Sequence, residues 1–153
     1  MKNSILRAEK ARYGAQRRMD QRRTWIGLGG NIGNVFATFA STRSQLCELA
    51  VGQIVVSPIY ESEPWGITDQ PVFFNQVVGL EPRYSPPKTL EALLDIEEAH
   101  GRIRGEKWGP RSLDLDLLSW PDQVIESDTL ICPHPRLSER LFVLAPWADV
   151  APE

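Results

Sequence analysis

The stretch Lys107-Trp108-Gly109-Pro110-Arg111-Ser112-Leu113-Asp114-Leu115-Asp116-Leu117-Leu118 decides how this chain is interpreted. From Leu113 on, apolar and acidic residues alternate, which predicts a half-buried strand. Side chains on a strand alternate between its two faces, so Asp114 and Asp116 share one face and lie roughly 7 Å apart. Two such carboxylates repel each other unless positive charge lies between them. Two Mg²⁺ ions about 3.5–4 Å apart would fit that gap, and the alternative is a solvated edge strand that binds nothing.

The residues before this strand strengthen the case for a metal site. Arg111 supplies a cation and Trp108 a large flat ring. Acidic metal ligands, an arginine and an aromatic side chain together indicate a site for a nucleoside triphosphate.

Composition limits the possible classes of protein. A length of 153 residues, 42% hydrophobic and 24% charged, is typical of one soluble globular domain. No apolar run approaches the roughly 20 residues of a membrane span, and the charged N-terminus lacks the apolar segment of a signal peptide. Cys47 and Cys132 stand far apart without zinc-like spacing, so we expect two reduced core thiols in a cytoplasmic protein.

Charge divides the chain at residue 23. Residues 1–23 hold eight Lys or Arg and two Asp or Glu, whereas residues 24–153 hold nine and eighteen. The first segment predicts a basic N-terminal extension that is disordered or a frayed helix, and a basic arm for RNA is the alternative. A start at Met19 would remove most of it. The acidic body argues against nucleic-acid binding by the domain at 24–153.

The pattern of the body predicts alternating strands and helices. Thr24–Asn31 is a strand that ends in a glycine turn, and Ile32 stands where a dinucleotide-binding motif needs its third glycine. Asn34 caps a helix that reaches about Leu49, with a buried stripe of Phe36, Phe39, Ala40 and Cys47. Further elements are a strand at 53–60, a loop at 61–71, a strand at 73–80, a helix that ends near His100 and a short strand within 123–131.

Two polar residues stand on faces that are otherwise apolar. Asn75 shares a strand face with Phe73 and Val77, so its amide is either a satisfied core group or a recognition group for a polar-edged heterocycle. Glu97 continues the helical stripe of Leu90, Leu93 and Leu94, where it is either a structural ion pair or a site residue.

The whole stretch at 107–118 resembles the signature of the 6-hydroxymethyl-7,8-dihydropterin pyrophosphokinase family, which acts in folate biosynthesis, and the similarity covers roughly residues 24–153. The resemblance implies an α+β fold with a mostly antiparallel sheet, packed helices and a ferredoxin-like core. It implies transfer of pyrophosphate from ATP to the reduced pterin, with ATP as co-substrate and two Mg²⁺ ions, and neither nucleic acid, nor a membrane, nor an obligatory protein partner.

The same resemblance assigns roles to individual residues. The catalytic residues would be Arg102, Arg111, Asp114 and Asp116, with Asp114 and Asp116 holding the metals. The pterin site would be formed by Ser62, Trp65, Phe73, Asn75, Trp108 and Phe142. The ATP site would be formed by Glu97, Arg104, Arg111, His134 and Arg140. The glycine-punctuated segment 101–110 would act as a lid.

Some positions depart from the family pattern. Gly105 stands in place of a common lysine, Pro135 in place of a tyrosine and Leu94 in place of a glutamine that contacts adenine. Two other functions stay open, a nucleotide-sugar transferase that uses Asp-x-Asp and an RNA-binding module that uses the basic arm.

Overall fold

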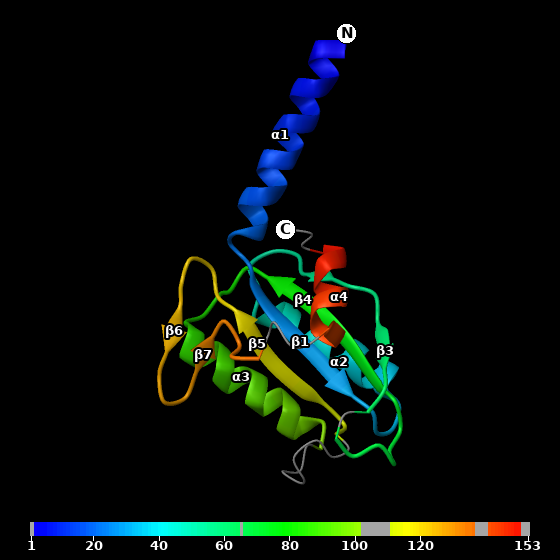
Figure 1. Ribbon diagram of the computed structural model, residues 1–153. Helices are drawn as coiled ribbons and strands as arrows, with labels where there is room; N and C mark the ends of the chain where they lie inside the picture. Colours follow the sequence, from blue (N-terminus) through cyan, green and yellow to red (C-terminus); the bar gives the residue numbers. More distant parts are fainter. Residues whose placement is uncertain (1, 65, 102–110, 137–140, 151–153) are drawn as a thin grey trace.

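The computed structural model describes residues 2–64, 66–101, 111–136 and 141–150. Figure 1 shows a helix that extends from a body in which other helices cover both faces of a sheet. The elements in chain order are α1 (Lys2–Asp20), β1 (Thr24–Gly30), α2 (Val35–Glu48), β2 (Val55–Val56), β3 (Tyr60–Ser62), β4 (Phe73–Leu80), α3 (Pro86–Ala99), β5 (Asp114–Ser119), β6 (Ile125–Glu126), β7 (Ile131–Cys132) and α4 (Leu141–Val150).

The main sheet has the strand order β2-β4-β1-β5, and β3 pairs with a different part of β4. All of these pairs are antiparallel. The succession β1-α2-β2-β4-α3-β5 is the βαββαβ pattern, in which each helix joins two strands that flank a third. The expected α+β fold with a ferredoxin-like core is therefore confirmed.

Helices α2 and α3 cover one face of the sheet (Figure 1). Each begins at a residue whose side chain accepts a hydrogen bond from a backbone N–H, Asn34 from Ala37 and Ser85 from Lys88. Their buried side chains pack with the apolar residues of β1, β4 and β5 in one continuous core. This core contains Ile26, Leu28, Phe39, Leu46, Val78, Leu80, Leu93, Leu113, Leu115 and Leu117.

The phase of both helices differs from the expected stripe. In α2 the buried residues are Val35, Phe39, Thr42 and Leu46, whereas Phe36, Ala40 and Cys47 are exposed. In α3 they are Thr89, Leu93, Ile96 and Glu97, whereas Leu94 is 49% exposed. Two of the buried residues are threonines, which the apolar pattern did not predict, and the Thr42 hydroxyl donates to the Thr38 carbonyl at 2.8 Å.

Helix α4 lies on the opposite face (Figure 1). Trp25, Val77, Leu118 and Val143 are buried there, and Trp147 and Val150 pack against them. Helix α4 continues as far as Val150. The sheet is thus covered on both faces, but on this face α4 covers the apolar part.

The expected strand at 53–60 is interrupted. Only Val55–Val56 and Tyr60–Ser62 pair with β4, so the expected loop begins two residues later than predicted. Pro58 has no N–H to donate to a ladder. Ser57 replaces the lost pairing, because its Oγ accepts from the backbone N–H of Val77 at 2.9 Å.

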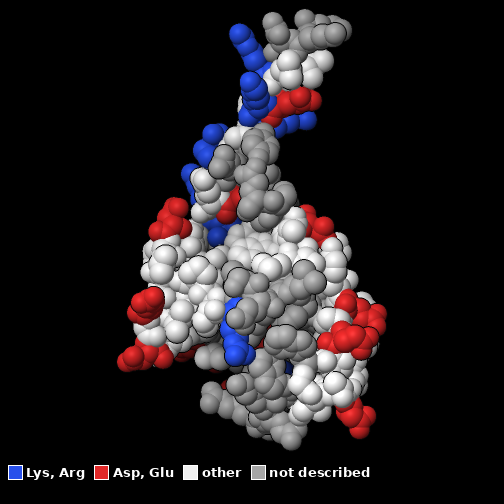
Figure 2. Space-filling model, in the orientation of Figure 1, with Lys and Arg blue, Asp and Glu red and all other residues white. Residues whose placement is uncertain are grey.

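The N-terminal segment is helical, where we expected disorder or a frayed helix. Lys, Arg and Ala make up nine of the 19 residues of α1, and these residues have high helix propensity. Figure 2 shows its Lys and Arg side chains along the projecting helix, while Asp and Glu are scattered over the body.

The two cysteines differ in burial. Cys132 is buried, and burial raises the pKa of its thiol, but Cys47 is exposed, so only one of the two expected core thiols lies in the core. Within the described ranges, no helix combines the length and the apolar character needed to cross a membrane.

Candidate active site

The two carboxylates of β5 face the same side of the sheet as Asn75 of β4. In the strand register Asp116 stands opposite Gly27, and Asp114 stands opposite Gly29. Gly29 also stands opposite Asn75 on the other side of β1. Asp114, Gly29 and Asn75 therefore form a row across three neighbouring strands, with the glycine in the middle.

The glycines of β1 leave backbone, rather than side chains, between the acidic strand and the amide. A Cβ at position 29 would meet Asn75 Oδ1 at 3.4 Å and Asp114 Cβ at 4.0 Å. Any larger side chain at this position would stand between the two polar groups. We call Gly27 and Gly29 the glycine strip.

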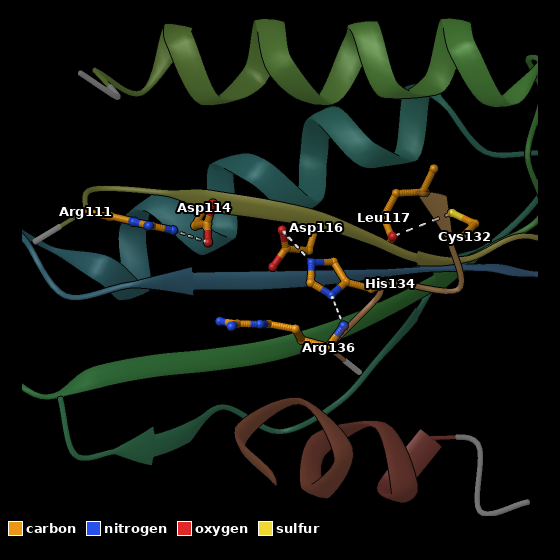
Figure 3. A network of polar contacts seen from close by, with 7 residues as sticks. All are labelled: Arg111, Asp114, Asp116, Leu117, Cys132, His134 and Arg136. Carbon is orange, nitrogen blue, oxygen red and sulfur yellow. Dashed lines mark hydrogen bonds and ion pairs between the residues drawn. The ribbon is translucent and has the colours of Figure 1, made fainter. Parts of the chain in front are cut away.

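Arg111 forms an ion pair with the first carboxylate. Its guanidinium Nη1 lies 2.7 Å from Asp114 Oδ2, and the two side chains are 30% and 21% exposed (Figure 3). Partial burial makes this pair stronger than an exposed surface pair, because less water screens it.

Asn31 fixes the backbone from which Arg111 extends. Its side-chain oxygen accepts from the Arg111 N–H at 2.9 Å, and its own N–H donates to the Arg111 carbonyl at 2.9 Å. Its amide nitrogen donates to Gln70 Oε1 at 3.0 Å and to the Pro71 carbonyl at 2.9 Å. This buried residue therefore joins the start of the acidic strand to the loop before β4.

Sequence reasoning did not identify Asn31 as part of the site. The signal available in the sequence was its place directly after Gly29-Gly30. In the structure, a Cβ at Gly30 would lie 2.7 Å from the Ser112 carbonyl oxygen. Such close backbone contact requires glycine, and it brings the next residue against the Arg111 segment.

His134 approaches the second carboxylate. Its Nδ1 accepts from the backbone N–H of Arg136 at 3.2 Å, which assigns the ring proton of the neutral form to Nε2. Nε2 lies 4.0 Å from Asp116 Oδ1 (Figure 3). The backbone N–H of His134 also donates to the Leu118 carbonyl at 2.9 Å, which holds this turn against β5.

Asn75 and Ser62 form the polar contact of the opposite strand. The Asn75 amide nitrogen donates to Ser62 Oγ at 2.9 Å, and Asn75 is only 6% exposed. Phe73 is half-buried on the same strand face, two residues from Asn75. The amide thus has an internal partner, as a core amide requires, and it also shares the face of the carboxylates.

The remaining predicted residues divide into two groups. Glu97 is 3% exposed near the end of α3, which packs on the other face of the sheet, so it does not lie in the row of Asp114 and Asn75. Phe142 is in the first turn of α4, but its side chain is outside the description. Trp65, Arg102, Arg104, Trp108 and Arg140 lie outside the described residues, as does the expected lid after Gly101.

The donor chemistry of this face fits Mg²⁺. Asp114 and Asp116 offer hard carboxylate oxygens on one strand face, and Mg²⁺ is usually held by one or two carboxylates, with substrate phosphates and water as its other ligands. Among the described ranges no group of three or more His, Cys, Asp or Glu could hold a metal.

Comparison with known proteins gives a consistent result. Residues 25–152 match the model of the 7,8-dihydro-6-hydroxymethylpterin-pyrophosphokinase family. A 2-amino-4-hydroxy-6-hydroxymethyldihydropteridine pyrophosphokinase of Methylorubrum extorquens is 39% identical over 132 residues, which are 86% of this chain and 84% of the relative. The protein of the same name from Bacillus subtilis is 42% identical over 127 residues, 82% of this chain and 76% of the relative.

The similarity also extends to larger proteins. A mitochondrial folate synthesis bifunctional protein of Arabidopsis thaliana is 44% identical over 128 residues, which are 82% of this chain but 23% of that relative. The matched region therefore occurs both in chains of similar length and as one part of a longer chain.

Proposed function

Because this chain belongs to the 7,8-dihydro-6-hydroxymethylpterin-pyrophosphokinase family, we propose that it transfers the terminal pyrophosphoryl group of ATP to 6-hydroxymethyl-7,8-dihydropterin. The hydroxymethyl oxygen forms a bond to the β-phosphorus. The bond between the β-phosphorus and the oxygen that bridges it to the α-phosphorus breaks, and AMP leaves with that oxygen. The product is the pterin pyrophosphate of folate biosynthesis.

The observation that carries this proposal is the row of Asp114, Gly29 and Asn75 on one face of the sheet. Transfer between ATP and a pterin requires a place for phosphates with their metal and a place for a polar ring, in contact with each other. The acidic strand offers the first and Asn75 the second. At Gly29 no side chain stands between the carboxylate and the amide, so the two places adjoin each other.

Asp114 and Asp116 would hold two Mg²⁺ ions together with the ATP phosphates. When bound, these ions neutralise charge on the triphosphate, and phosphoryl-type transfer depends mainly on such stabilisation and on positioning. The partial exposure of both carboxylates, 21% and 28%, leaves them open to a ligand. His134 would position Asp116. Its Nε2 lies 4.0 Å from Asp116 Oδ1, and its backbone N–H donates to the Leu118 carbonyl of β5.

The arginines would contact the phosphates. Arg111 extends from a backbone that Asn31 fixes, so its guanidinium can reach phosphate oxygens with two parallel N–H groups, which lysine cannot offer. We assign the companion role in transfer to Arg102. Glu97, Arg104, His134 and Arg140 would surround the ATP, as the family resemblance implies.

The pterin would lie at the β3–β4 side of the face. Asn75 offers both a donor and an acceptor to the edge of the ring, and its contact with Ser62 Oγ orients the amide. Phe73 and Phe142 would stack on the two faces of the ring, with Trp65 and Trp108 completing the site. A ring without the polar edge would offer no partner to the Asn75 oxygen and to the amide N–H that does not bond Ser62, which is a source of selectivity.

The decisive experiment mixes the purified protein with ATP, Mg²⁺ and the reduced pterin and measures AMP against ADP. We expect AMP and the pterin pyrophosphate in equal amounts, with no AMP when the pterin is omitted. ADP as the product would indicate a simple kinase, and the appearance of neither nucleotide would reject the proposal.

We also propose a cytoplasmic location. Both cysteines are free thiols, Cys47 at the surface and Cys132 in the core. Free thiols are typical of a reducing compartment. Fractionation of the source cells, with the enzyme activity as marker, tests the proposal.

A further inference from the structure

Arg111 occupies a position that the proposed metal chemistry needs. Its guanidinium is 2.7 Å from Asp114 Oδ2, the oxygen of a carboxylate that we assign to a metal. A carboxylate oxygen that accepts a guanidinium N–H at this distance cannot at the same time offer that lone pair to a small, hard cation. The oxygen has a second lone pair, but a guanidinium and a divalent cation on the same carboxylate would repel each other, so the ion pair and the metal site compete for Asp114.

The base of Arg111 is rigid, so its side chain is the part that can move. Three backbone-level hydrogen bonds hold residue 111, from the N–H groups of Asn31 and Ile32 to its carbonyl, at 2.9 and 3.2 Å, and from its own N–H to Asn31 Oδ1 at 2.9 Å. The side chain is 30% exposed, which leaves room for another rotamer. A guanidinium on a fixed base can turn from Asp114 to a ligand nearby without a change in the sheet.

The ion pair also has a clear purpose in the absence of a ligand. Asp114 and Asp116 face the same side of β5 and are both partly removed from water. Their mutual repulsion is lowered when a cation neutralises one of them. Arg111 thus supplies, from within the chain, the positive charge that the metal supplies in the loaded enzyme.

We propose that Arg111 takes the place of a metal ion on Asp114 and that metal and nucleotide enter by exchange with it. The proposal rests on the proposed function, because it assumes that Asp114 binds the metal of ATP. On binding of a metal–nucleotide complex, the guanidinium would leave Asp114 for the phosphate oxygens, and the Asp114 carboxylate would then hold the metal. A metal ion alone offers the Arg111 guanidinium no new partner. The metal ion therefore binds weakly to Asp114 when no nucleotide is present. Arg111 therefore couples the binding of metal to the binding of nucleotide, and this coupling is reciprocal.

The first test measures Mn²⁺ affinity from the electron paramagnetic resonance of free Mn²⁺, on the full chain, with and without a non-hydrolysable ATP analogue. Arg111→Gln should bind Mn²⁺ alone about ten-fold more tightly than the wild type, and it should lose most of the gain that the analogue gives. Arg83→Gln is the matched control, because it removes an equal charge from an arginine that donates to the Ala50 carbonyl instead. Its Mn²⁺ affinity should stay within two-fold of the wild type.

Equal or weaker binding of Mn²⁺ by Arg111→Gln, in the absence of nucleotide, would overturn the exchange. An equal increase in Arg83→Gln would also overturn it, since the effect would then be one of net charge. Asp114→Asn provides the baseline. In protein that already carries Asp114→Asn, adding Arg111→Gln should no longer change the Mn²⁺ affinity.

A second measurement follows the Arg111 guanidinium directly in the wild-type protein. The guanidinium resonances of Arg111 in the wild type, assigned by their absence in Arg111→Gln or by selective labelling, should show the Asp114 ion pair in metal-free protein. Mg²⁺ alone at moderate concentration should leave them in place, and Mg²⁺ with the analogue should shift them. Resonances that remain unchanged in the ternary mixture would refute the proposal.

AMP formation by the wild type, measured on the same preparation, separates this inference from the proposed function. Normal AMP formation without tighter Mn²⁺ binding by Arg111→Gln would reject the exchange and leave the pyrophosphokinase intact. Absence of AMP formation would reject the proposed function. The resonances of Arg111 would still report whether Mg²⁺ with the analogue displaces the guanidinium from Asp114.

Discussion

The two faces of the sheet differ although the same strands form them. The face toward α2 and α3 is mostly apolar, with Ile26, Leu28, Val78 and Leu115 in one core. Its buried polar residues include Gln76, which accepts a hydrogen bond from Arg43 of α2. The face toward α4 is apolar only where Trp25, Val77 and Leu118 meet that helix. Beyond them it carries Asp114, Asp116 and Asn75. The comparison shows how one strand can supply both core and chemistry, because successive side chains from Asp114 to Leu117 point to opposite faces.

The largest expected effect is on the core face. Leu115 lies between the two aspartates and is 5% exposed, so Leu115→Ala should lower the free energy of unfolding by about 2–5 kcal/mol through lost burial and a cavity. Urea denaturation measures this loss. Turnover per folded molecule at saturating substrates should change less than two-fold, and a large drop in turnover without a drop in stability would break the division between the faces.

The next effect belongs to the opposite face of the same strand. Asp114→Asn and Asp116→Asn should each lower turnover at least ~100-fold, about 2.7 kcal/mol in the barrier, because charge that develops in the transition state loses a prearranged partner. Thermal stability should be largely retained, since each change removes the repulsion between the two carboxylates, which in Asp114→Asn offsets the loss of the Arg111 ion pair. Steady-state kinetics and a melting curve on each variant test this, and near-normal turnover in either would remove that carboxylate from the metal site.

Asn75 sharpens the comparison across the glycine strip. Asn75→Ala should reduce the discrimination between the pterin and its deamino or deaza analogues by about 1–3 kcal/mol, since a directed amide is lost. Ser62→Ala keeps the amide but removes its 2.9 Å contact, so the same discrimination should fall by less. Competitive binding of the paired ligands measures both, and an equal loss of affinity for every ligand in both variants would contradict the assigned role.

A smaller effect concerns the attachment of α4 to the polar face. The Tyr60 hydroxyl donates to Asp149, and this hydrogen bond, with some burial and the nearby negative charge, raises the pKa of Tyr60 above its ordinary value of 10.0. A raised tyrosine pKa means that the contribution to stability is complete below pH 10 and is lost as the pH rises through the folded-state value. Melting temperatures between pH 8 and 11 should therefore fall less steeply in Tyr60→Phe than in the wild type. Identical slopes would show that the contact makes no difference.

The smallest expected effect is that of removing α1, which belongs to neither face of the sheet. Removal of residues 1–18 changes the formal charge from −3 to −8, because six Lys or Arg and one Glu are lost. Melting temperature and turnover should stay within error, since the helix extends away from the body (Figure 1). A loss of activity in the shortened protein would assign the basic helix to the enzyme.

The strands and their faces were predictable because alternation is a local property. The range of β4 is the predicted one, residues 73–80, and the shared face of Asp114 and Asp116 follows from their spacing alone. Asn34 and its helix were recognisable from a local cap. The fold class followed from the resemblance at 107–118.

Features that depend on distant contacts were not predictable in the same way. The burial of Thr42 and Thr89 depends on how closely each helix approaches the sheet, and the apolar pattern favoured Phe36 and Leu94 instead. Asn31 acquires its role from residues 39 to 80 positions away along the chain. For residues 1–23 the charge pattern left disorder and a frayed helix open, and the length of α1 depends on helix propensity rather than on charge.

Strand β1 pairs with segments that are far from it along the chain. Its partners in β5 follow it by more than half of the chain, and those in β4 by about a third. Non-local pairing of this kind costs loop-closure entropy before it yields contacts, which places such folds among the slower small domains. During synthesis, a chain that has emerged only through α3 carries the amide of Asn75 but neither aspartate. The protein therefore becomes an enzyme late in its synthesis, when β5 adds to the open edge of β1.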